Sequence, residues 1–181
     1  IDSANHASTH VGCRLSKATT LAYPHGDTDA LAALLDSKRR AYRHVWIVSD
    51  GVFSMAGSVA PLRKLDALAQ AHRAFLYIDD AHGIGSLGER GMGLCELANV
   101  KPHVVTGTFS KAFGASGAFV LCGAAVKALL LRRAEALVYS SAVSPRAALA
   151  ITRAIDTVSN ATQARERLRG YGRYLRAQCD A

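Results

Sequence analysis

Three short runs of apolar, β-favouring residues most constrain the fold of this chain. They occupy residues 45–48 (VWIV), 75–78 (FLYI) and, more weakly, 103–107 (HVVTG). Within each run the apolar side chains follow one another without alternation. This pattern is typical of strands that are covered on both faces, as in a parallel sheet.

Helical patterns separate these runs. Asp27 is a suitable N-cap for one helix, and Pro61 fits the first turn of another. Further helices are expected over residues 6–17 and 124–134. A long helix is expected from Pro145, with a break near residues 159–160, and the glycines of residues 170–172 could fray or turn it again. The expected inner faces are Leu31, Leu34 and Leu35; Leu62, Leu65, Leu68 and Ala69; and Ala148, Ile151, Ile155 and Val158.

This alternation of strands and helices predicts an α/β fold, a three-layer αβα arrangement with a mostly parallel sheet. In such sheets ligands bind beyond the carboxyl ends of the strands. Polar residues follow all three apolar runs, at residues 49–50, at Asp79 and at residues 108–111. We therefore expect the three strand ends to converge on one site.

Composition narrows the class of protein. The chain has 181 residues, enough for one domain with a sizeable core, and half of them are hydrophobic. No apolar run is long enough to span a bilayer, so no membrane association is expected. The first residues do not form a signal peptide, and the missing initiator methionine suggests that the chain is part of something larger. Four widely spaced cysteines predict free thiols in a reducing, cytoplasmic compartment.

The net charge of +8 lies largely in two clusters, residues 38–43 and 165–176. Solvated faces are the favoured interpretation. A basic mouth for a phosphorylated or CoA-bearing substrate comes next. Nucleic acid comes third and is not expected as a partner, because no recognised binding motif accompanies the charge.

Lys111 lies among small and apolar residues in the segment 108–117 (TFSKAFGASG). A lysine in such surroundings is expected to be poorly solvated, which favours the neutral amine that attacks carbonyl groups. The hydroxyls of Thr108 and Ser110 stand beside it and could hold a phosphate. Together with Asp79, the lysine supplies the two protein groups that pyridoxal phosphate chemistry requires.

Asp79 begins the segment 79–83 (DDAHG), directly after the second apolar run. It could pair with a protonated ring nitrogen, or it could be an ordinary turn aspartate. His82 could contact the phenolic oxygen of the cofactor, or bond only to backbone. Asp80 is interpreted as structural. A metal site is not expected, because no further His or Cys stands at ligand spacing.

The glycines of residues 83–88 (GIGSLG) match the literal dinucleotide fingerprint. The helix that the fingerprint requires does not follow, since residues 89–93 are predicted to be loop. In addition, no acidic residue follows the glycines by about twenty positions, where the fingerprint has one that binds the ribose. We reject the dinucleotide interpretation and expect a flexible loop beside the site.

Four more residues have two interpretations each. His6 could stack on a flat aromatic cofactor or be an exposed helix-start histidine. Ser54 could bond to the cofactor or shape a turn. Ser140 and Ser141 could end a strand or offer hydroxyls to a phosphate.

Taken together, these segments resemble the α-oxoamine synthases, which are fold-type I pyridoxal phosphate enzymes. The matching pieces run in order through nearly the whole chain. They are residues 2–8 (DSANHAS), 49–55 (SDGVFSM), 79–83 (DDAHG), 108–114 (TFSKAFG) and 139–141 (YSS). As a set they are far more specific than any single piece.

The resemblance implies a role for each matching residue. Lys111 would bond covalently to pyridoxal 5'-phosphate and act as the base. Asp79 would pair with the pyridine nitrogen, and His82 and Ser54 would contact the phenolate side. His6 would stack over the ring. Thr108 would bind the phosphate, with Ser140 or Ser141 reaching in from the second subunit of a homodimer.

The resemblance also implies an activity and a domain division. The reaction would condense an amino acid with an acyl-CoA and release CO2 and CoA. Residues 1–144 would be part of the cofactor-binding large domain, without its N-terminal portion. Residues 145–181 would lead into a C-terminal small domain. Where the family has an acid after the Ser-Met pair, this chain has Ala56. Another fold-type I reaction, or a non-catalytic remnant, remains an alternative.

Overall fold

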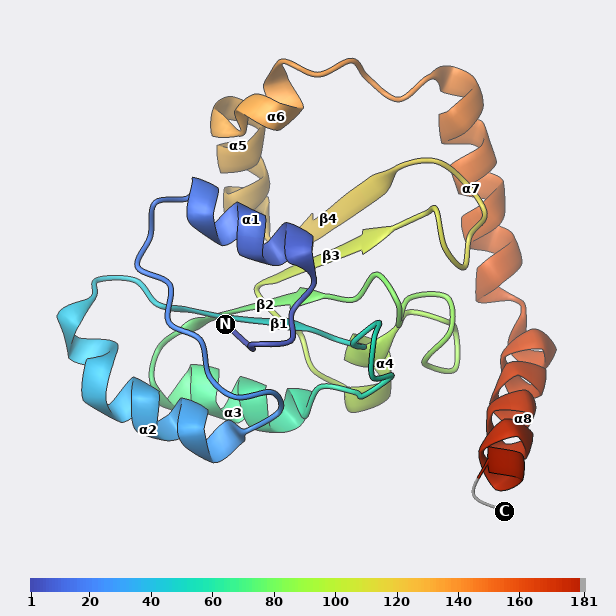
Figure 1. The fold of residues 1–181 in the computed structure, drawn as a ribbon. Coiled ribbons are helices and arrows are strands. Elements are labelled where there is room, and N and C mark those ends of the chain that lie inside the picture. The colour runs from blue at the N-terminus through green and yellow to red at the C-terminus, as the bar shows by residue number, and fades with distance from the viewer. Residues whose placement is uncertain (180–181) are drawn as a thin grey trace.

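A four-stranded sheet forms the centre of the computed structural model, which describes residues 1–179 (Figure 1). The strands lie side by side in chain order, β1-β2-β3-β4. The first three are parallel, and β4 is antiparallel to β3. Their bounds are β1 Trp46–Asp50, β2 Phe75–Asp79, β3 Val104–Thr108 and β4 Ala118–Cys122.

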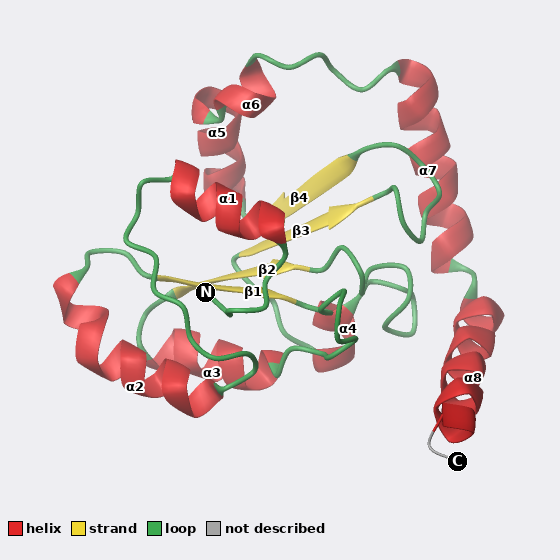
Figure 2. Ribbon diagram, in the orientation of Figure 1, coloured by secondary structure: helices red, strands yellow, loops and turns green. Residues whose placement is uncertain are grey.

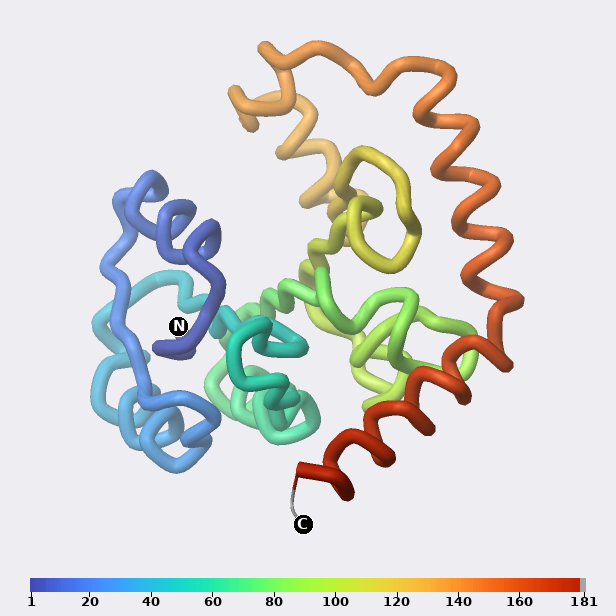
Figure 3. Tube along the Cα trace, turned by 45° about the vertical axis from the view of Figure 1, so that its right-hand side comes forward, coloured from blue at the N-terminus to red at the C-terminus, as the bar shows by residue number. Residues whose placement is uncertain are grey.

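Helices cover both faces of this sheet, which confirms the three-layer prediction (Figure 2). One face packs on α2 and α3, and α1 and α5 stand over the other. The helices α7 and α8 follow one another: in Figure 3, α7 descends along one side of the molecule and α8 slants inward below it. The helices are α1 Ala7–Leu15, α2 Thr28–Lys38, η1 Arg39–Ala41, α3 Leu62–Ala71, α4 Leu94–Ala98, α5 Ala124–Arg133, α6 Glu135–Val138, α7 Pro145–Ser159 and α8 Thr162–Cys179.

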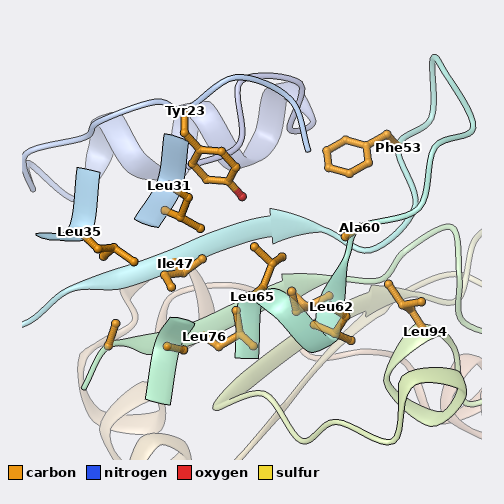
Figure 4. Packing of buried hydrophobic residues seen from close by; sticks show 13 residues of the cluster. Tyr23, Leu31, Leu35, Ile47, Phe53, Ala60, Leu62, Leu65, Leu76 and Leu94 are labelled. Carbon is orange, nitrogen blue, oxygen red and sulfur yellow. The ribbon is translucent and has the colours of Figure 1, made fainter. Parts of the chain in front are cut away.

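The hydrophobic core lies between the sheet and the α2–α3 layer (Figure 4). Alternate residues of β1 and β2 point into it, among them Ile47, Leu76 and Ile78, which are at most 2% exposed. They meet the predicted inner faces of the two helices, including Leu31 and Leu65. The alternation leaves the other face of the strands free to form a site.

The predicted helix starts are also confirmed. The Asp27 carboxylate accepts hydrogen bonds from the backbone N–H groups of Asp29 and Ala30, at 3.1 and 2.8 Å. Pro61 directly precedes α3. Asp27 accepts N–H groups that would otherwise lack a partner at the helix start, and Pro61 has no N–H group that needs one.

Asp80 is buried in a cage of glycines, which confirms its structural interpretation. Its Oδ2 accepts the backbone N–H of Leu94 at 2.7 Å, at the start of α4. A Cβ added at Gly51, Gly83 or Gly93 would overlap its carboxylate. These three glycines therefore let the backbone close around the Asp80 carboxylate, and only Gly83 of them belongs to the segment that matches the dinucleotide fingerprint. The loop is buried and hydrogen-bonded at Gly83, Ile84 and Gly85, in contrast to the flexible loop that we expected.

The C-terminal region departs from the sequence predictions in several places. α8 continues through residues 170–172, where fraying or a turn was considered, because single glycines cost a helix only about 1 kcal/mol each. The predicted break at residues 159–160 is present between α7 and α8. Residues 135–138 form a short helix, so Ser140 and Ser141 do not end a strand. The sequence analysis also missed α4 and β4. Residues 180–181 of the predicted C-terminal segment lie outside the described residues.

Arg165 is the clearest departure from the prediction of a solvated basic face. It is 3% exposed, and its guanidinium donates to the carbonyls of Val158 and Glu89. These bonds tie the junction of α7 and α8 to the loop around Asp80. On α7 itself, Ile151 and Val158 are half-buried, whereas Ala148 and Ile155 are exposed.

Leu76→Ala tests the position of the core. Leu76 is fully buried, so we expect the free energy of unfolding to fall by about 2–5 kcal/mol, measured by urea titration. Leu15→Ala is the matched control, because Leu15 is 76% exposed. Its effect should stay within about 0.5 kcal/mol. Equal losses in the two variants would show that the core lies elsewhere.

Asp80→Asn tests the buried carboxylate through the pH dependence of stability. Burial raises the pKa of Asp80 to about 6, while the Leu94 N–H opposes the shift. The native state therefore holds the proton more tightly than the unfolded chain, and this contribution to stability is lost as pH rises from about 4 to above 6.

The asparagine variant should lack that loss, so between pH 4 and pH 7.5 it should gain up to about 3 kcal/mol relative to the parent. Asp36→Asn is the control, because its side chain is 76% exposed. Parallel pH profiles for Asp80→Asn and the parent would contradict the assignment.

Candidate functional site

A cleft of about 710 Å³ opens on the sheet face opposite the core. Its floor is made by alternate residues of the strands, and its walls by residues from α1 and α5. The alternation explains the floor, since residues two apart in a strand point to the same face. The floor residues are Asp50, Tyr77, Asp79, Thr106, Thr108, Ala118, Val120 and Cys122.

The carboxyl ends of the three parallel strands meet at this cleft, as the sequence predicted. The register pairs Asp50 of β1 with Asp79 of β2, and Asp79 with Thr106 of β3. Lys111 lies three residues beyond the end of β3 and lines the same cleft. The sheet thereby brings the side chains of Asp50, Asp79 and Lys111 into one cleft.

Asp79 and His82 both line the cleft. Asp79 is half-buried, and its Oδ1 accepts the backbone N–H of Ala81 at 3.1 Å. Desolvation and then the charge of Lys111 lower the pKa of His82, and Asp79 opposes them. The imidazole is therefore neutral at pH 7, with one nitrogen able to donate and the other to accept a hydrogen bond.

The Lys111 side chain lines the cleft but is exposed, so the prediction of a poorly solvated amine is wrong for this structure. The loop that follows β3 carries the lysine at the mouth of the cleft. That loop is held by the buried Phe109, whose backbone N–H donates to Gly117 at 2.9 Å. Small and apolar sequence neighbours do not bury the Lys111 side chain, because the loop turns this segment toward solvent.

Thr108 lines the cleft, whereas the neighbouring Ser110 is exposed and does not. Their hydroxyls lie 2.8 Å apart, and the Ser110 backbone N–H donates to Thr108 Oγ1 at 3.1 Å. Ser110 therefore supports the threonine at this end of the cleft.

His6 is the exposed helix-start histidine of one interpretation, and its stacking on a cofactor stays a prediction. It is exposed and caps α1, with Nδ1 accepting the Ser8 backbone N–H at 3.3 Å, and it also lines the cleft. Its own backbone N–H donates to Asp50 Oδ2 at 3.0 Å. The preceding Asn5 bonds to the carbonyl of Val48 and to the N–H of Asp50. The histidine is thus fixed to the end of β1.

Ser54, Ser140 and Ser141 are not among the residues that line the cleft. All three are exposed, and the Ser140 hydroxyl donates to the carbonyl of Leu137 at 3.3 Å. Their roles toward a cofactor stay predictions.

Asp50 is the main site residue to which the sequence analysis gave no role. It is 4% exposed, and its Oδ1 has no hydrogen-bond partner within residues 1–179. Burial raises its pKa to about 6, with Asp79 adding to the shift and the His6 N–H opposing it. Its position at the end of an apolar run, like that of Asp79, was the sequence signal that could have identified it.

These residues fit pyridoxal 5'-phosphate. An amine that can bond to the aldehyde and a carboxylate that can hold the ring nitrogen line one cleft. The same cleft offers a hydroxyl at Thr108, a neutral imidazole at His82 and the unpartnered buried oxygen of Asp50. Within the described chain, no cluster of three or more His, Cys, Asp or Glu side chains could hold a metal ion.

Two further findings bear on the sequence predictions. The four cysteines at positions 13, 95, 122 and 179 are free, as their spacing predicted. In the part of the chain that the structure describes, no helix has the length and apolarity needed to cross a membrane.

The chain is similar to curated relatives named 8-amino-7-oxononanoate synthase. The relative from Bordetella petrii is 46% identical over 181 residues, which cover 98% of this chain and 45% of the relative. A second, from Bacillus subtilis and named 8-amino-7-oxononanoate synthase 2, is 41% identical over 170 residues. It is matched over 94% of this chain and 43% of its own length. The chain therefore spans somewhat less than half the length of these relatives.

Solved structures of two kinds share the fold. A serine palmitoyltransferase from S. paucimobilis, solved with a bound PLP–myriocin adduct, matches with a TM-score of 0.86 and 28% identity. The match covers 93% of this chain and 43% of that one. An 8-amino-7-oxononanoate synthase from Francisella tularensis matches with a TM-score of 0.83 and 28% identity, over 99% and 52% of the two chains.

The family model for aminotransferase class I and II matches residues 1–181, the whole of the sequence. This match agrees with the mostly parallel sheet and with the lysine and aspartate at its carboxyl edge. The chain belongs to the aminotransferase class I and II family.

Proposed function

We propose that this chain is the central part of a pyridoxal phosphate-dependent α-oxoamine synthase. The observation that carries the proposal is the joint presence of Asp79, His82 and Lys111 in one cleft, at the carboxyl ends of β2 and β3. The names of the curated relatives support the same class of enzyme.

Bound pyridoxal phosphate supplies an electron sink that stabilises negative charge on the α-carbon of an attached amino acid. Asp79 keeps the ring nitrogen protonated by accepting its hydrogen bond. Lys111 would hold the aldehyde end of the cofactor and would serve as the general base for the α-proton. Asp79 ends β2, Lys111 lies in the loop after the neighbouring β3, and both line the cleft, so we expect one flat ring to reach them together.

The remaining residues orient the ligand. His82, neutral at pH 7, offers a hydrogen bond to the phenolate oxygen. The Thr108 hydroxyl binds the phosphate, and His6 stacks over the ring from the start of α1. We retain the proposals that Ser54 contacts the phenolate side, and that Ser140 or Ser141 reaches the phosphate of a second subunit in a homodimer.

For substrates we propose L-alanine and pimeloyl-CoA, with 8-amino-7-oxononanoate as the product, a step of biotin biosynthesis. Lys111 would take the α-proton of alanine, and the α-carbon would bond to the thioester carbonyl carbon as the carbon–sulfur bond breaks and the thiolate leaves as CoA. The carboxylate would then leave as CO2, and a proton would take its place on the α-carbon. The relatives' names support this choice. A glycine C-acetyltransferase or 5-aminolevulinate synthase type of reaction is the alternative within the same class.

The proposal includes a division of the chain. Residues 1–144 belong to the large domain, and the helices from Pro145 lead toward a second domain. Exposed apolar side chains on α5, α7 and α8 support contacts beyond this chain, since large apolar patches on protein surfaces mark interfaces. They include Leu129, Leu131, Leu149, Leu168, Tyr171 and Leu175. The free thiols support a reducing, cytoplasmic location.

Lys111→Ala tests the covalent link to the cofactor. After incubation with pyridoxal phosphate and reduction with borohydride, the parent protein should carry the cofactor on the peptide that contains Lys111. The alanine variant should lose both this adduct and the yellow absorption band. Lys127→Ala is the matched control, because Lys127 lines the same cleft from α5, and it should keep the adduct on Lys111. An adduct that persists in Lys111→Ala would refute the assignment.

CoA release distinguishes the possible substrates. We expect thiol release from pimeloyl-CoA with L-alanine to exceed release from acetyl-CoA with glycine or from succinyl-CoA with glycine by at least about tenfold, a difference of 1.4 kcal/mol in transition-state binding. Preference for a glycine pair would move the assignment to the alternative reaction. If the protein binds the cofactor but transaminates alanine without releasing thiol, the proposal of a condensing activity is wrong.

A further inference from the structure

We propose that Asp50 and Asp79 act as a carboxylate pair, in which the unpartnered Oδ1 of Asp50 is a second acceptor for a cationic N–H group bound in the cleft. The inference rests on the proposed function, in which that group is the protonated ring nitrogen of pyridoxal phosphate. It adds a cofactor-binding residue from β1 to the groups contributed by β2 and β3.

The first support is the burial and pairing of Asp50. The residue is 4% exposed and belongs to the cleft lining. Oδ2 is already occupied by the backbone N–H of His6 at 3.0 Å, and Oδ1 is buried with no donor within residues 1–179. A buried carboxylate oxygen without a donor is costly, so its presence in a ligand cleft points to a donor on the ligand.

The second support is the strand register. Asp50 and Asp79 are direct partners on neighbouring parallel strands, and both lie on the cleft face. Neighbouring strands are about 4.8 Å apart, so one N–H group can lie within reach of both carboxylates. The proximity of Asp79 also contributes to the raised pKa of Asp50.

The third support is the lack of a protein cation for the pair. Within residues 1–179, the ion pairs join His25 to Asp2 and His72 to Asp36, and neither involves Asp50 or Asp79. Two adjacent carboxylates favour either a shared proton or a bound cation. A metal ion fits poorly, since no cluster of three ligand side chains exists in the same residues. A flat cationic ring with one N–H group, such as protonated pyridoxal phosphate, suits a cleft that also holds the amine of Lys111.

Asp50→Asn is a conservative test of this role. The amide oxygen can still accept the His6 N–H, so α1 keeps its anchor. The amide NH2 then occupies the place of Oδ1, where it faces a protonated ring nitrogen as a second donor. We expect the dissociation constant for pyridoxal phosphate to rise at least about tenfold, the effect of losing a hydrogen bond to a charged group.

The analogue 1-deazapyridoxal phosphate, in which carbon replaces the ring nitrogen, separates this contact from general damage to the site. Its dissociation constant should change less than about twofold in Asp50→Asn, because it has no ring N–H to lose. Equal losses for cofactor and analogue, or no loss for either, would overturn the proposal. In the variant, the 15N signal of labelled cofactor should also move toward that of a neutral pyridine, and an unchanged signal would count against the pair.

Two further variants complete the design. Asp80→Asn is the matched control, because Asp80 is equally buried and also has an unpartnered Oδ1, but does not line the cleft. It should leave the ratio of the two dissociation constants unchanged. Asp50→Ser keeps an acceptor for His6 in a smaller side chain, and the same selective loss is expected if the asparagine variant does not fold. Failure of the parent protein to bind pyridoxal phosphate at Lys111 would overturn the proposed function, whereas normal binding by the parent and by both Asp50 variants would overturn the pair alone.

Discussion

The parallel pairing of β1, β2 and β3 is the constraint on which the site depends. The register sets Asp50 level with Asp79, and Asp79 level with Thr106. A shift of one residue in any strand would turn its polar end into the core and its apolar partner toward the cleft. Burial of Ile47, Leu76 and Ile78 against α2 and α3 opposes such a shift, so the packing on one face fixes the chemistry on the other.

Buried charged groups hold the irregular segments that no strand can fix. Asp80 gathers the glycine loop and the start of α4, and Arg165 joins the same loop to the α7–α8 junction. Asp2 plays the same part near the N-terminus, where it accepts from His25 at 3.0 Å and from the Gly26 backbone N–H at 2.9 Å. Each carboxylate or guanidinium bonds to main-chain groups that would otherwise lack partners, which is why loops beside the cleft can be buried.

Sequence patterns predicted the parts of the structure that local chemistry decides. Uninterrupted apolar runs identified β1, β2 and β3, and Asp27 and Pro61 marked helix starts. The convergence of Asp79, His82, Lys111 and Thr108 followed from the rule for strand ends, aided by the resemblance to α-oxoamine synthases. β4 was missed although residues 118–122 (AFVLC) are also an uninterrupted apolar run; its residues are exposed or half-buried, and it is antiparallel to β3.

The errors share a cause in tertiary contacts. Arg165 was assigned to a solvated face because its charge in the sequence does not predict the carbonyl groups of Val158 and Glu89 that bind it. Lys111 was expected to be shielded by its sequence neighbours, yet the loop after β3 turns it outward. Asp50 received no role because its importance depends on Asp79, which is distant in sequence and adjacent only through the sheet register.

A structure of the protein with pyridoxal phosphate bound tests the account most directly. Electron density should join the cofactor's aldehyde carbon to Lys111 Nζ, with the ring nitrogen about 3 Å from a carboxylate oxygen of Asp79. A cofactor bound outside this cleft would contradict the account, as would one joined to Lys111 with its ring nitrogen turned away from the ends of β1 and β2.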